Sequence, residues 1–401
     1  MRPRLAVFFS HPTQHHAPLW REITRRNDIE LRVFYYTNFG TSRESLDRHF
    51  GVTFAWDVDL LAGYDHEFLC QSSGVPPSPG PTLRAPGLAS ALDEFRPHVA
   101  YVQGWGSLAS INAIRQCTRR RIPIITQTDA NIKGATGITW LSRVTLGRWA
   151  AARFSGFLVC SSSNEAVYRR LFHVPKQRLR AAPFPFDADR FGSGPASPTA
   201  AREQLAYMGV DPSVLTVTWA GKLRPLKRPL DMIQAFCQVN LVTPLQLLMV
   251  GSGELASEVR SAIPEQWKHR CVLPGFVNQS LMPAVFAAGE IYAMTSDQEP
   301  LGMSVVEAMA MGAACVVSDA CGVVGNDELL DTLIPGATGL AFSAGDVNDL
   351  ASKLASLALD PCLRRRISEA GRARVLARTA RTTADRVAEL VFELAEDQKP
   401  S

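Results

Sequence analysis

Two glutamates that lie eight residues apart, Glu299 and Glu307, flank the sequence Gly-Met-Ser at residues 302–304. The apolar residues 291–296 predict a buried strand before this stretch, and the residues from Gly302 onward predict a helix. The first N–H groups of a helix have no partner within it and lie at the positive end of its dipole, which favours a bound anion. Because Gly302 has no side chain, a phosphate group can approach the backbone there. The spacing therefore predicts an anion-binding corner between a strand and a helix.

Each glutamate also has a purely structural interpretation. Ser304 and Glu307 fit the spacing of a capping box, in which Glu307 bonds back to the start of its own helix. Glu299 fits an ordinary exposed acid of a loop. The two residues alone leave these alternatives open.

A second group of residues suited to anions follows the apolar run at residues 215–220. The sequence GKLRPLKRP begins there with Gly221 and carries Lys222 and Lys227. Two ammonium groups on one loop suit a diphosphate, because each acts as a compact point charge. One ion pair at about 4 Å contributes roughly 4 kcal/mol at an effective dielectric constant of about 20, before desolvation. A solvated basic loop before a helix is the alternative.

Two further loops follow predicted strands in the same half of the chain. The turn GSGEL contains Gly251 and Gly253, but Ala256 stands where a dinucleotide-binding fingerprint needs its third glycine, so this signal is weak. The sequence GFV places Phe276 and Val277 after another strand. Because open parallel sheets bind ligands at the carboxyl ends of their strands, we expect these loops to meet at one edge.

Short apolar runs alternate with amphipathic stretches along the whole chain, which predicts parallel sheets covered by helices on both faces. A chain of 401 residues is too long for one typical core. The predicted fold class is therefore α/β, with two doubly wound, Rossmann-like domains facing a central cleft. Residues 192–201 are rich in Gly, Pro and Ser and predict the linker. The expected parts are residues 1–195, residues 205–380 and a final helix, 381–401, that can pack back on the first domain.

Charge is distributed unevenly along the chain. The net charge is +4, but residues 1–195 hold 24 lysines and arginines against 15 acids, whereas the remainder holds 18 against 23. A basic first half suits an anionic partner or a phospholipid surface, and solvated arginines explain it equally well. The arginines are dispersed without an aromatic-basic repeat, which argues against nucleic acid as a partner.

The rest of the composition describes a soluble globular protein, with 46% hydrophobic and 20% charged residues. No apolar run is long enough to cross a membrane, so we expect a cytoplasmic protein, with peripheral contact at the inner membrane face as an open alternative. The eight cysteines are scattered without a C-x-x-C pair, which suits reduced, buried thiols rather than disulfides or a zinc site.

The lysine loop, the G-x-G turn, GFV and Glu-x7-Glu follow successive strands in this order, and together they resemble the family 4 glycosyltransferases of the GT-B fold. The resemblance covers most of the second half, through AGKLRPLKRP, LLMVGSGEL, VLPGFV, SDQEPLGMSVVEAMAMGAACVVSDACG and ATGLAFSAGD. The Glu-x7-Glu signature is specific, and the other pieces are individually loose. The first half resembles the family more faintly, through VCSSSNEAVYRRLFHVPKQRLR and PFPFDADRF.

This resemblance implies a retaining, metal-independent transfer of a hexose-type sugar from a nucleoside-diphosphate sugar to a hydroxyl acceptor, with no cofactor besides the donor. Residues 1–195 would bind the acceptor and residues 205–380 the donor. UDP-sugars are the first expectation for the donor. The sequence does not choose among polysaccharide, glycolipid and natural-product acceptors, or between anionic and lipid-linked ones.

The family's nucleoside- and sugar-binding positions fall on the motifs described above. By this resemblance, Glu307 would hold the ribose hydroxyls and Glu299 the hydroxyls of the donor sugar. Phe276 and Val277 would lie along the base.

The diphosphate would be held by Lys222, Lys227 and the backbone N–H groups of residues 302–304. Departure of the nucleoside diphosphate builds negative charge on its phosphates, which fixed cations and a helix N-terminus stabilise in the transition state. The expected donor site comprises Gly221, Lys222, Lys227, Gly251, Phe276, Val277, Glu299, Gly302, Met303, Ser304 and Glu307.

Some positions depart from the family pattern. The family usually has Arg where Lys222 stands, so a point charge replaces a bidentate fork. SHPTQHHAP, which contains His11, replaces the Gly-Gly loop that often follows the first strand, and Asp129 lies nearest to a position where many members have His. His11 and Asp129 are candidates for contact with the sugar or the acceptor hydroxyl, although Asp129 also fits a helix cap or a turn. The expected catalytic residues are Lys222, Lys227, Glu299, His11 and Asp129.

Other patterns indicate chemistry more weakly. His11 and His15 have the spacing of a metal pair on a helix, but Pro12 and Pro18 and the lack of a third ligand nearby argue against it. Trp105 can line the acceptor side or pack in the core.

The D-x-D pattern of metal-dependent glycosyltransferases occurs at Asp57-x-Asp59 and at Asp187-x-Asp189. This pattern is common by chance, so we expect no metal site. Two rival functions remain: another GT-B enzyme, such as a nucleotide-sugar epimerase or hydrolase, and a binding protein with a degenerate site.

Overall fold

The computed structural model describes residues 2–41, 45–47, 52–70, 80–130, 137–195 and 197–397. The chain forms two compact units. Unit 1 comprises Met1–Asp47, Thr53–Asp187 and Arg378–Ser401, and unit 2 comprises Arg48–Val52 and Ala188–Ala377. The chain therefore enters unit 2 at Ala188, before the predicted linker at residues 192–201, of which Ala196 lies outside the described residues.

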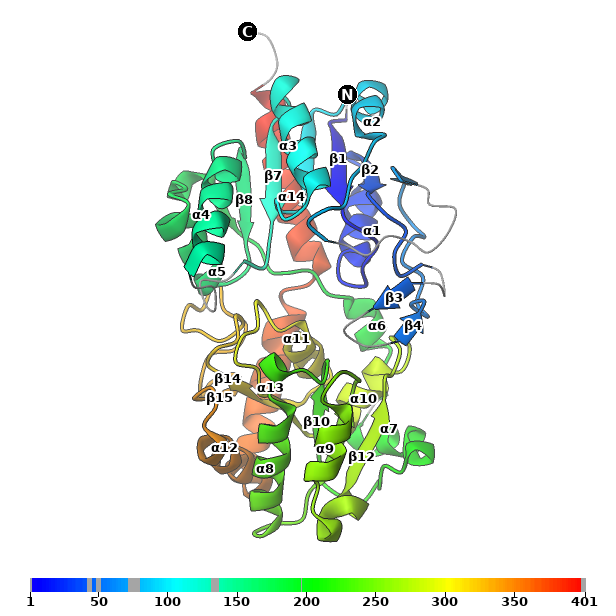
Figure 1. The fold of residues 1–401 in the computed structure, drawn as a ribbon, viewed down its shortest axis with the longest axis vertical. Coiled ribbons are helices and arrows are strands. Elements are labelled where there is room, and N and C mark those ends of the chain that lie inside the picture. The colour runs from blue at the N-terminus through cyan, green and yellow to red at the C-terminus, as the bar shows by residue number, and fades with distance from the viewer. Residues whose placement is uncertain are drawn as a thin grey trace. The chain divides into compact units, whose positions relative to one another are not determined.

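Unit 1 is built on a parallel sheet of seven strands in the order β5-β2-β1-β6-β7-β8-β9 (Figure 1). Its strands are β1 (Arg4–Phe9), β2 (Glu30–Tyr35), β5 (His66–Phe68), β6 (Val99–Val102), β7 (Ile124–Gln127), β8 (Gly156–Val159) and β9 (Leu179–Ala181). Strands β6, β7 and β8 are buried along their whole length, as parallel strands covered on both faces should be. Two short strands, β3 (Ser45–Asp47) and β4 (Val52–Phe54), pair with each other separately.

Helices cover both faces of this sheet, with α1 and α14 on one face and α2 and α3 on the other (Figure 1). The helical segments are α1 (Ala17–Arg26), α2 (Leu88–Phe95), α3 (Leu108–Arg119), α4 (Gly137–Ala151), α5 (Ser162–Ala166), a π-helical turn (Val167–Leu171), a 3-10 turn (Lys176–Arg178) and α14 (Ala380–Glu396). Successive side chains of a strand point to opposite faces of the sheet. The apolar side chains of β1 therefore contact helices on both faces. Val7 and Phe9 belong to the core that includes α1 and α14, whereas Phe8 stacks on Phe34.

Unit 2 is built on a second parallel sheet, of six strands in the order β12-β11-β10-β13-β14-β15. Its strands are β10 (Thr216–Ala220), β11 (Gln246–Val250), β12 (Cys271–Gly275), β13 (Ile291–Met294), β14 (Ala314–Ser318) and β15 (Leu340–Phe342). The strand order doubles back at β10, which lies between β11 and β13. In such a sheet the ligand site is expected where the order reverses, at the carboxyl ends of the strands.

The sheet of unit 2 is also covered on both faces. Its helical segments are α6 (Ala188–Gly192), α7 (Pro198–Gln204), a 3-10 turn (Ala206–Met208), a 3-10 turn (Pro225–Lys227), α8 (Pro229–Asn240), α9 (Ala256–Ala262), a 3-10 helix (Glu265–Arg270), α10 (Met282–Ala288), α11 (Met303–Ala310), α12 (Val347–Leu359) and α13 (Pro361–Leu376). Trp219 of β10 joins the core that α8 and α12 cover, whereas Tyr292 of β13 meets Phe286 of α10 on the other face. The predicted fold class, two doubly wound α/β domains, is confirmed.

The last helix, α14, belongs to unit 1 although the chain reaches it from unit 2. Thr383 Oγ1 donates a hydrogen bond to Pro183 O at 2.8 Å. Leu390 lies against β8, where a Cβ atom at Gly156 would come 3.2 Å from its side chain. Helix α14 is thus part of the core of the first unit.

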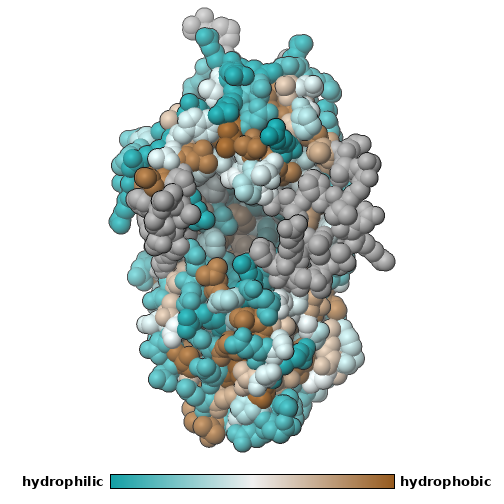
Figure 2. Space-filling model, viewed as in Figure 1, coloured by the Kyte–Doolittle hydropathy of each residue, from teal (hydrophilic) through white to brown (hydrophobic). Residues whose placement is uncertain are grey.

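No helix in the described part of the chain is both long and apolar enough to span a membrane. On the face shown in Figure 2, hydrophobic and hydrophilic areas alternate over unit 2. Scattered exposed apolar side chains are normal for protein surfaces.

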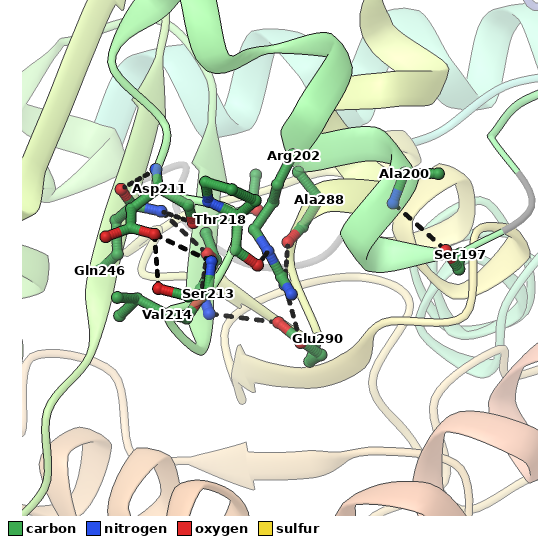
Figure 3. Close-up of polar contacts among 12 residues, drawn as sticks. Ser197, Ala200, Arg202, Asp211, Ser213, Val214, Thr218, Gln246, Ala288 and Glu290 are labelled. Carbon is green, nitrogen blue, oxygen red and sulfur yellow. Dashed lines mark hydrogen bonds and ion pairs between the residues drawn. The ribbon is translucent and has the colours of Figure 1, made fainter.

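A buried arginine ties α7 to the amino-terminal edge of the second sheet (Figure 3). Arg202 Nη1 donates to Glu290 Oε1 at 2.7 Å and to Ala288 O at 3.3 Å, and its Nε donates to Pro212 O at 3.0 Å. Glu290 Oε2 accepts a hydrogen bond from the Thr216 N–H at 3.1 Å. The pair therefore fixes the starts of β10 and β13, the two strands whose far ends carry the lysine loop and the Glu-x7-Glu corner.

Arg202→Ala should destabilise unit 2 by about 3 kcal/mol, because it leaves the Glu290 carboxylate without its partner in a water-poor site. The free energy of unfolding of unit 2, measured in urea, tests this. Arg365→Ala is the matched control, because the Arg365–Glu369 pair is exposed and should contribute no more than about 0.5 kcal/mol. Equal effects of the two variants would contradict the role given to Arg202.

Candidate active site

The loops that leave the carboxyl ends of β10, β11 and β12 are bonded to one another through their backbones. The Gly221 N–H donates to Val250 O at 3.0 Å, and the Gly251 N–H donates to Gly275 O at 2.8 Å. The Leu223 N–H donates to Ser252 O at 2.9 Å. This places the GK loop, the G-x-G turn and the GFV loop side by side at one edge of the sheet, as the sequence predicts.

Glycine at two positions of the G-x-G turn is required by these close approaches. Gly251 has φ +138°, and a Cβ atom there would lie 1.8 Å from Gly221 O. Gly253 has φ +154°, and its Cβ would lie 2.5 Å from Leu223 O. The turn therefore has a structural reason for its glycines, and a ligand contact at Gly251 stays a prediction.

The loop that carries Lys227 is anchored to the end of β13. Thr295 Oγ1 donates to Lys227 O at 2.7 Å and accepts a hydrogen bond from Trp219 Nε1 at 3.1 Å. The Asp297 N–H donates to Leu226 O at 3.0 Å. Thr295 was not singled out from the sequence, since nothing in its surroundings distinguishes it from any other strand-end threonine.

Lys227 and Glu299 contact each other directly. Lys227 Nζ donates a hydrogen bond to Glu299 Oε2, and the two side chains are 27% and 14% exposed. An ion pair that is partly shielded from water is stronger than one at the surface, because the effective dielectric constant is lower there. The structure thus brings together the lysine predicted for the phosphates and the glutamate predicted for the donor sugar.

The backbone around Glu299 is held by a neighbouring segment of the chain. The Gly322 N–H donates to Glu299 O at 3.0 Å, and the Val323 N–H donates to Leu301 O at 2.9 Å. A Cβ atom at Gly322 would lie 1.8 Å from Pro300 O, so only glycine permits this approach. The segment that follows β14 therefore fixes the position of Glu299.

Gly302 is the N-cap residue of α11. Its φ of +100° suits glycine, and a Cβ atom there would lie 2.6 Å from Cys321 Sγ. Ser304 lies inside the helix and accepts a hydrogen bond from the Tyr292 hydroxyl at 2.8 Å. The capping-box interpretation of Ser304 and Glu307 is therefore wrong, because the N-cap residue is Gly302, two residues before Ser304, and no side chain caps the helix.

Glu307 is buried, with 7% of its surface exposed. Its Oε1 lies 3.7 Å from Nη2 of Arg190, a residue of α6. Arg190 was not singled out from the sequence, although it stands in PFPFDADRF, a segment that carries part of the family resemblance. Its type and position alone do not show that it reaches a carboxylate more than a hundred residues away.

The remaining residues of the expected donor site lie at the same edge of the sheet. Lys222 is half-buried on the loop after β10, and its carbonyl accepts a hydrogen bond from the Arg224 N–H at 2.9 Å. Phe276 and Val277 follow β12 directly, and Val277 is buried. Met303 is the first residue of α11.

The two candidates in unit 1 follow different strands of its sheet. His11 comes after β1 and Asp129 after β7, and β6 lies between these strands. His11 Nδ1 lies 2.9 Å from Ser10 Oγ, and its ring meets Phe39 edge to face at 5.5 Å. Burial lowers the pKa of His11 to about 4, so its imidazole is neutral near pH 7. Asp129 is exposed.

His16 and Trp105 pack against aromatic side chains. His16 is buried among Phe9, Trp20 and Phe184, with ring centroids 4.4, 5.9 and 4.9 Å away. Trp105 packs against two phenylalanines, which fits the core-packing interpretation.

The D-x-D patterns and the histidine pair show no sign of a metal cluster. Within the described ranges, no group of three or more His, Cys, Asp or Glu side chains is arranged to hold a metal ion. Asp59 instead accepts hydrogen bonds from the Leu61 and Ala62 N–H groups, which lower the pKa of its carboxyl group.

Comparison with known proteins places this geometry in a family. Residues 209–374 match the model of "Glycosyl transferases group 1". This region contains the GK loop, the G-x-G turn, the GFV loop and both glutamates. Residues 209–374 are therefore similar to the group 1 glycosyltransferases. The predicted resemblance to family 4 glycosyltransferases is confirmed.

Two curated relatives share part of the sequence of this chain. A GDP-mannose-dependent monoacylated alpha-(1-6)-phosphatidylinositol monomannoside mannosyltransferase from Corynebacterium glutamicum is 31% identical over 200 residues, which cover 47% of this chain and 49% of that protein. A glycogen synthase from Mycobacterium tuberculosis is 24% identical over 299 residues, 70% of this chain and 65% of that one. The chain thus spans about half the length of the first relative and just under two thirds of the second.

The fold matches a solved structure over almost the whole chain. HepE from Anabaena, in complex with UDP and glucose, has a TM-score of 0.71 at 17% identity and covers 98% of this chain and 100% of its own. This likeness confirms the GT-B fold. At such low identity it shows the fold alone.

The low pKa of His11 predicts a loss of stability in acid. In the unfolded chain a histidine titrates near 6.5, whereas folded His11 stays neutral down to about pH 4. His11 therefore has no effect on stability above pH 6.5 and destabilises the fold increasingly as the pH falls from 6.5 towards 4. By linkage, it should lower the free energy of unfolding by roughly 2 kcal/mol between pH 7 and pH 5.

Urea unfolding of the wild type and of His11→Gln at both pH values measures this effect. The pKa of His16 is also lowered by burial, so the variant should lose only part of the pH dependence. A pH dependence that is the same in both proteins would contradict the burial of His11.

Proposed function

We propose that this protein transfers a hexose-type sugar from a nucleoside-diphosphate sugar, with UDP-sugars the first candidates, to a hydroxyl group of an acceptor, with retention at the anomeric carbon. The observation that supports it most is the contact between Lys227 and Glu299 beside the uncapped start of α11, with Glu307 one turn further along. A cation, a helix N-terminus and two carboxylates suit a ligand that carries phosphates between two sets of hydroxyl groups.

Binding of such a donor would exchange partners within this cluster. Without a ligand, the Lys227 ammonium and the Glu299 carboxylate satisfy each other. A diphosphate offers Lys227 a more highly charged partner, which leaves Glu299 to accept hydrogen bonds from the sugar hydroxyls. Lys222 and the N–H groups of residues 302–304 would complete the phosphate site.

In the reaction, the bond between the anomeric carbon and the diphosphate oxygen breaks, and a bond to the acceptor oxygen forms. The acceptor's hydroxyl proton passes to the departing nucleoside diphosphate or to solvent. Negative charge grows on the diphosphate as it leaves, and fixed positive charge around it lowers the barrier. This chemistry needs no cofactor besides the donor, and metal independence remains an expectation to be tested with EDTA.

The relatives suggest which donors to test first. HepE was solved with UDP and with UDP-glucose, and the corynebacterial relative is GDP-mannose-dependent. Purified protein should therefore be screened by thermal shift against UDP-, GDP-, dTDP- and ADP-sugars. Release of nucleotide that depends on an acceptor would distinguish a transferase from the main alternative, a nucleotide-sugar epimerase or hydrolase.

Lys227→Ala should lower kcat at least about 100-fold, because it removes positive charge whose stabilising effect grows in the transition state. Turnover of the donor found by the screen, measured with and without EDTA, tests this. Lys268→Ala is the control, since Lys268 pairs with Glu265 on the surface. A near-normal kcat in Lys227→Ala, or a strict requirement for Mg²⁺ in the wild type, would overturn the proposed mechanism.

We further propose that the acceptor is anionic. A cavity of about 560 Å³ in unit 1 is lined by Arg169, Arg170, His173 and Lys176, with Glu165 the one acidic residue of its lining. The arginines lie on a π-helical turn, a conformation that is frequent at functional sites. Two arginines and a lysine thus line a space large enough for a ligand group.

The double variant Arg169→Gln/Arg170→Gln should raise KM for anionic acceptors about tenfold and leave the donor KM unchanged, because the donor is expected to bind in unit 2. The test compares soluble uronic-acid glycosides, phosphatidylinositol vesicles and neutral glycosides as acceptors. Arg386→Gln, at an exposed pair with Glu389, is the control. If the variant does not distinguish anionic from neutral acceptors, the cavity has no role in acceptor binding.

A further inference from the structure

Arg190 contacts two separate parts of the expected nucleoside site. Its Nη1 donates to Gln279 O at 2.9 Å and to Gln279 Oε1 at 3.0 Å, and its Nη2 lies 3.7 Å from Glu307 Oε1. The Arg190 and Glu307 side chains are only 12% and 9% exposed. The arginine therefore connects a buried carboxylate with the loop that follows β12.

These two partners have different expected roles toward a nucleoside. Glu307 is expected to hold the ribose hydroxyls. Gln279 lies two residues after Val277, in the loop whose Phe276 and Val277 are expected along the base. One guanidinium group thus joins the residues predicted for the ribose to the residues predicted for the base.

We propose that Arg190 is a positioning residue for nucleoside recognition, which holds the Glu307 carboxylate and the 276–279 loop in register for the nucleoside of a nucleoside diphosphate. This inference rests on the proposed function. A guanidinium group suits the task because its donors form a rigid fork that reaches two partners at once, whereas an ammonium group is a single point of charge. It also places a positive charge beside a buried carboxylate, which would be costly to leave unpaired.

Anchoring of α6 by itself does not require Arg190. The next residue, Phe191, is buried and meets Phe286 of α10 with ring centroids 6.2 Å apart. The Arg190 guanidinium lies 4.4 Å from the Phe191 ring, so this aromatic side chain also restricts where the arginine can point. The apolar contact holds the helix, and the charged contacts are directed at the nucleoside residues.

Arg190 lies close to the point where the chain passes from unit 1 into unit 2. It is the third residue after the chain enters unit 2 at Ala188. Nucleoside binding at Glu307 would therefore act directly on the segment by which the chain passes from one unit to the other. Hydrogen exchange at residues 186–194 should slow on nucleotide binding in the wild type and change less in Arg190→Ala.

The test separates the nucleoside from the phosphates with three probes: UDP, uridine and inorganic pyrophosphate, or the corresponding set for the base that the donor screen identifies. Arg190→Ala and Arg190→Lys should both weaken the binding of UDP and of uridine at least tenfold and leave the binding of pyrophosphate unchanged. Lys227→Ala should weaken the binding of UDP and of pyrophosphate and leave uridine binding unchanged. Arg364→Ala is the matched control. The described hydrogen bonds of the Arg364 side chain go only to backbone carbonyls at the end of α12.

A double-mutant cycle with Glu307→Gln shows whether Arg190 acts through Glu307. The two losses in uridine affinity should not add if it does. Wild-type affinity for UDP in Arg190→Ala would overturn the proposal. Equal losses of affinity for uridine and for pyrophosphate in Arg190→Lys would also overturn it. Arg190→Lys keeps the positive charge and can be tested even if Arg190→Ala folds poorly. A wild-type protein that binds pyrophosphate but no nucleoside diphosphate would instead overturn the proposed function.

Discussion

The close approach of loop backbones at the carboxyl edge of the second sheet is the constraint on which the site depends. Gly251 lies against Gly221 O and Gly322 lies against Pro300 O, at distances that leave no room for a Cβ atom. A side chain at Gly251 would displace the loop that carries Lys227, and one at Gly322 would displace the loop that carries Glu299. Because both loops are also hydrogen-bonded through their backbones, the ion pair forms between two positioned groups rather than two mobile ones. Pre-organisation of this kind means that little reorganisation is needed when the ligand binds.

The pairing of charges at the carboxyl edge of the second sheet determines which charged groups a ligand must provide. Glu299 is neutralised by Lys227 and Glu307 by Arg190, so each carboxylate already has a cation beside it. The two pairs differ in how they can respond. Lys227 is a flexible point charge that can transfer to a phosphate, whereas Arg190 is fixed on Gln279 and Phe191. The first pair is therefore suited to exchange and the second to stay in place.

The sequence predicts the fold and the motifs well because both depend on local patterns. Apolar runs and helical periodicity predict the two doubly wound sheets, and Glu-x7-Glu follows the strand that carries it. What escaped prediction depends on contacts between segments far apart in the chain. Spacing in the sequence does not reveal that Thr295 contacts Lys227 or that Arg190 contacts Glu307. These residues become neighbours only when the chain folds. The capping-box interpretation failed for a local reason: Gly302, with φ +100°, is the N-cap residue, and it lies two residues before Ser304.

The departures of the first unit from the family pattern bear on how the reaction can proceed. His11 stands where many members have glycine, and burial lowers its pKa to about 4, so it is a weak base that stays neutral at working pH. A neutral imidazole hydrogen-bonded to Ser10 can orient a hydroxyl group but adds no positive charge for a leaving phosphate. His11 is therefore not a strong base for removing the proton of the acceptor hydroxyl. Under the proposed function, the barrier would then be lowered by stabilising the departing diphosphate, which is the task proposed for Lys222, Lys227 and the start of α11.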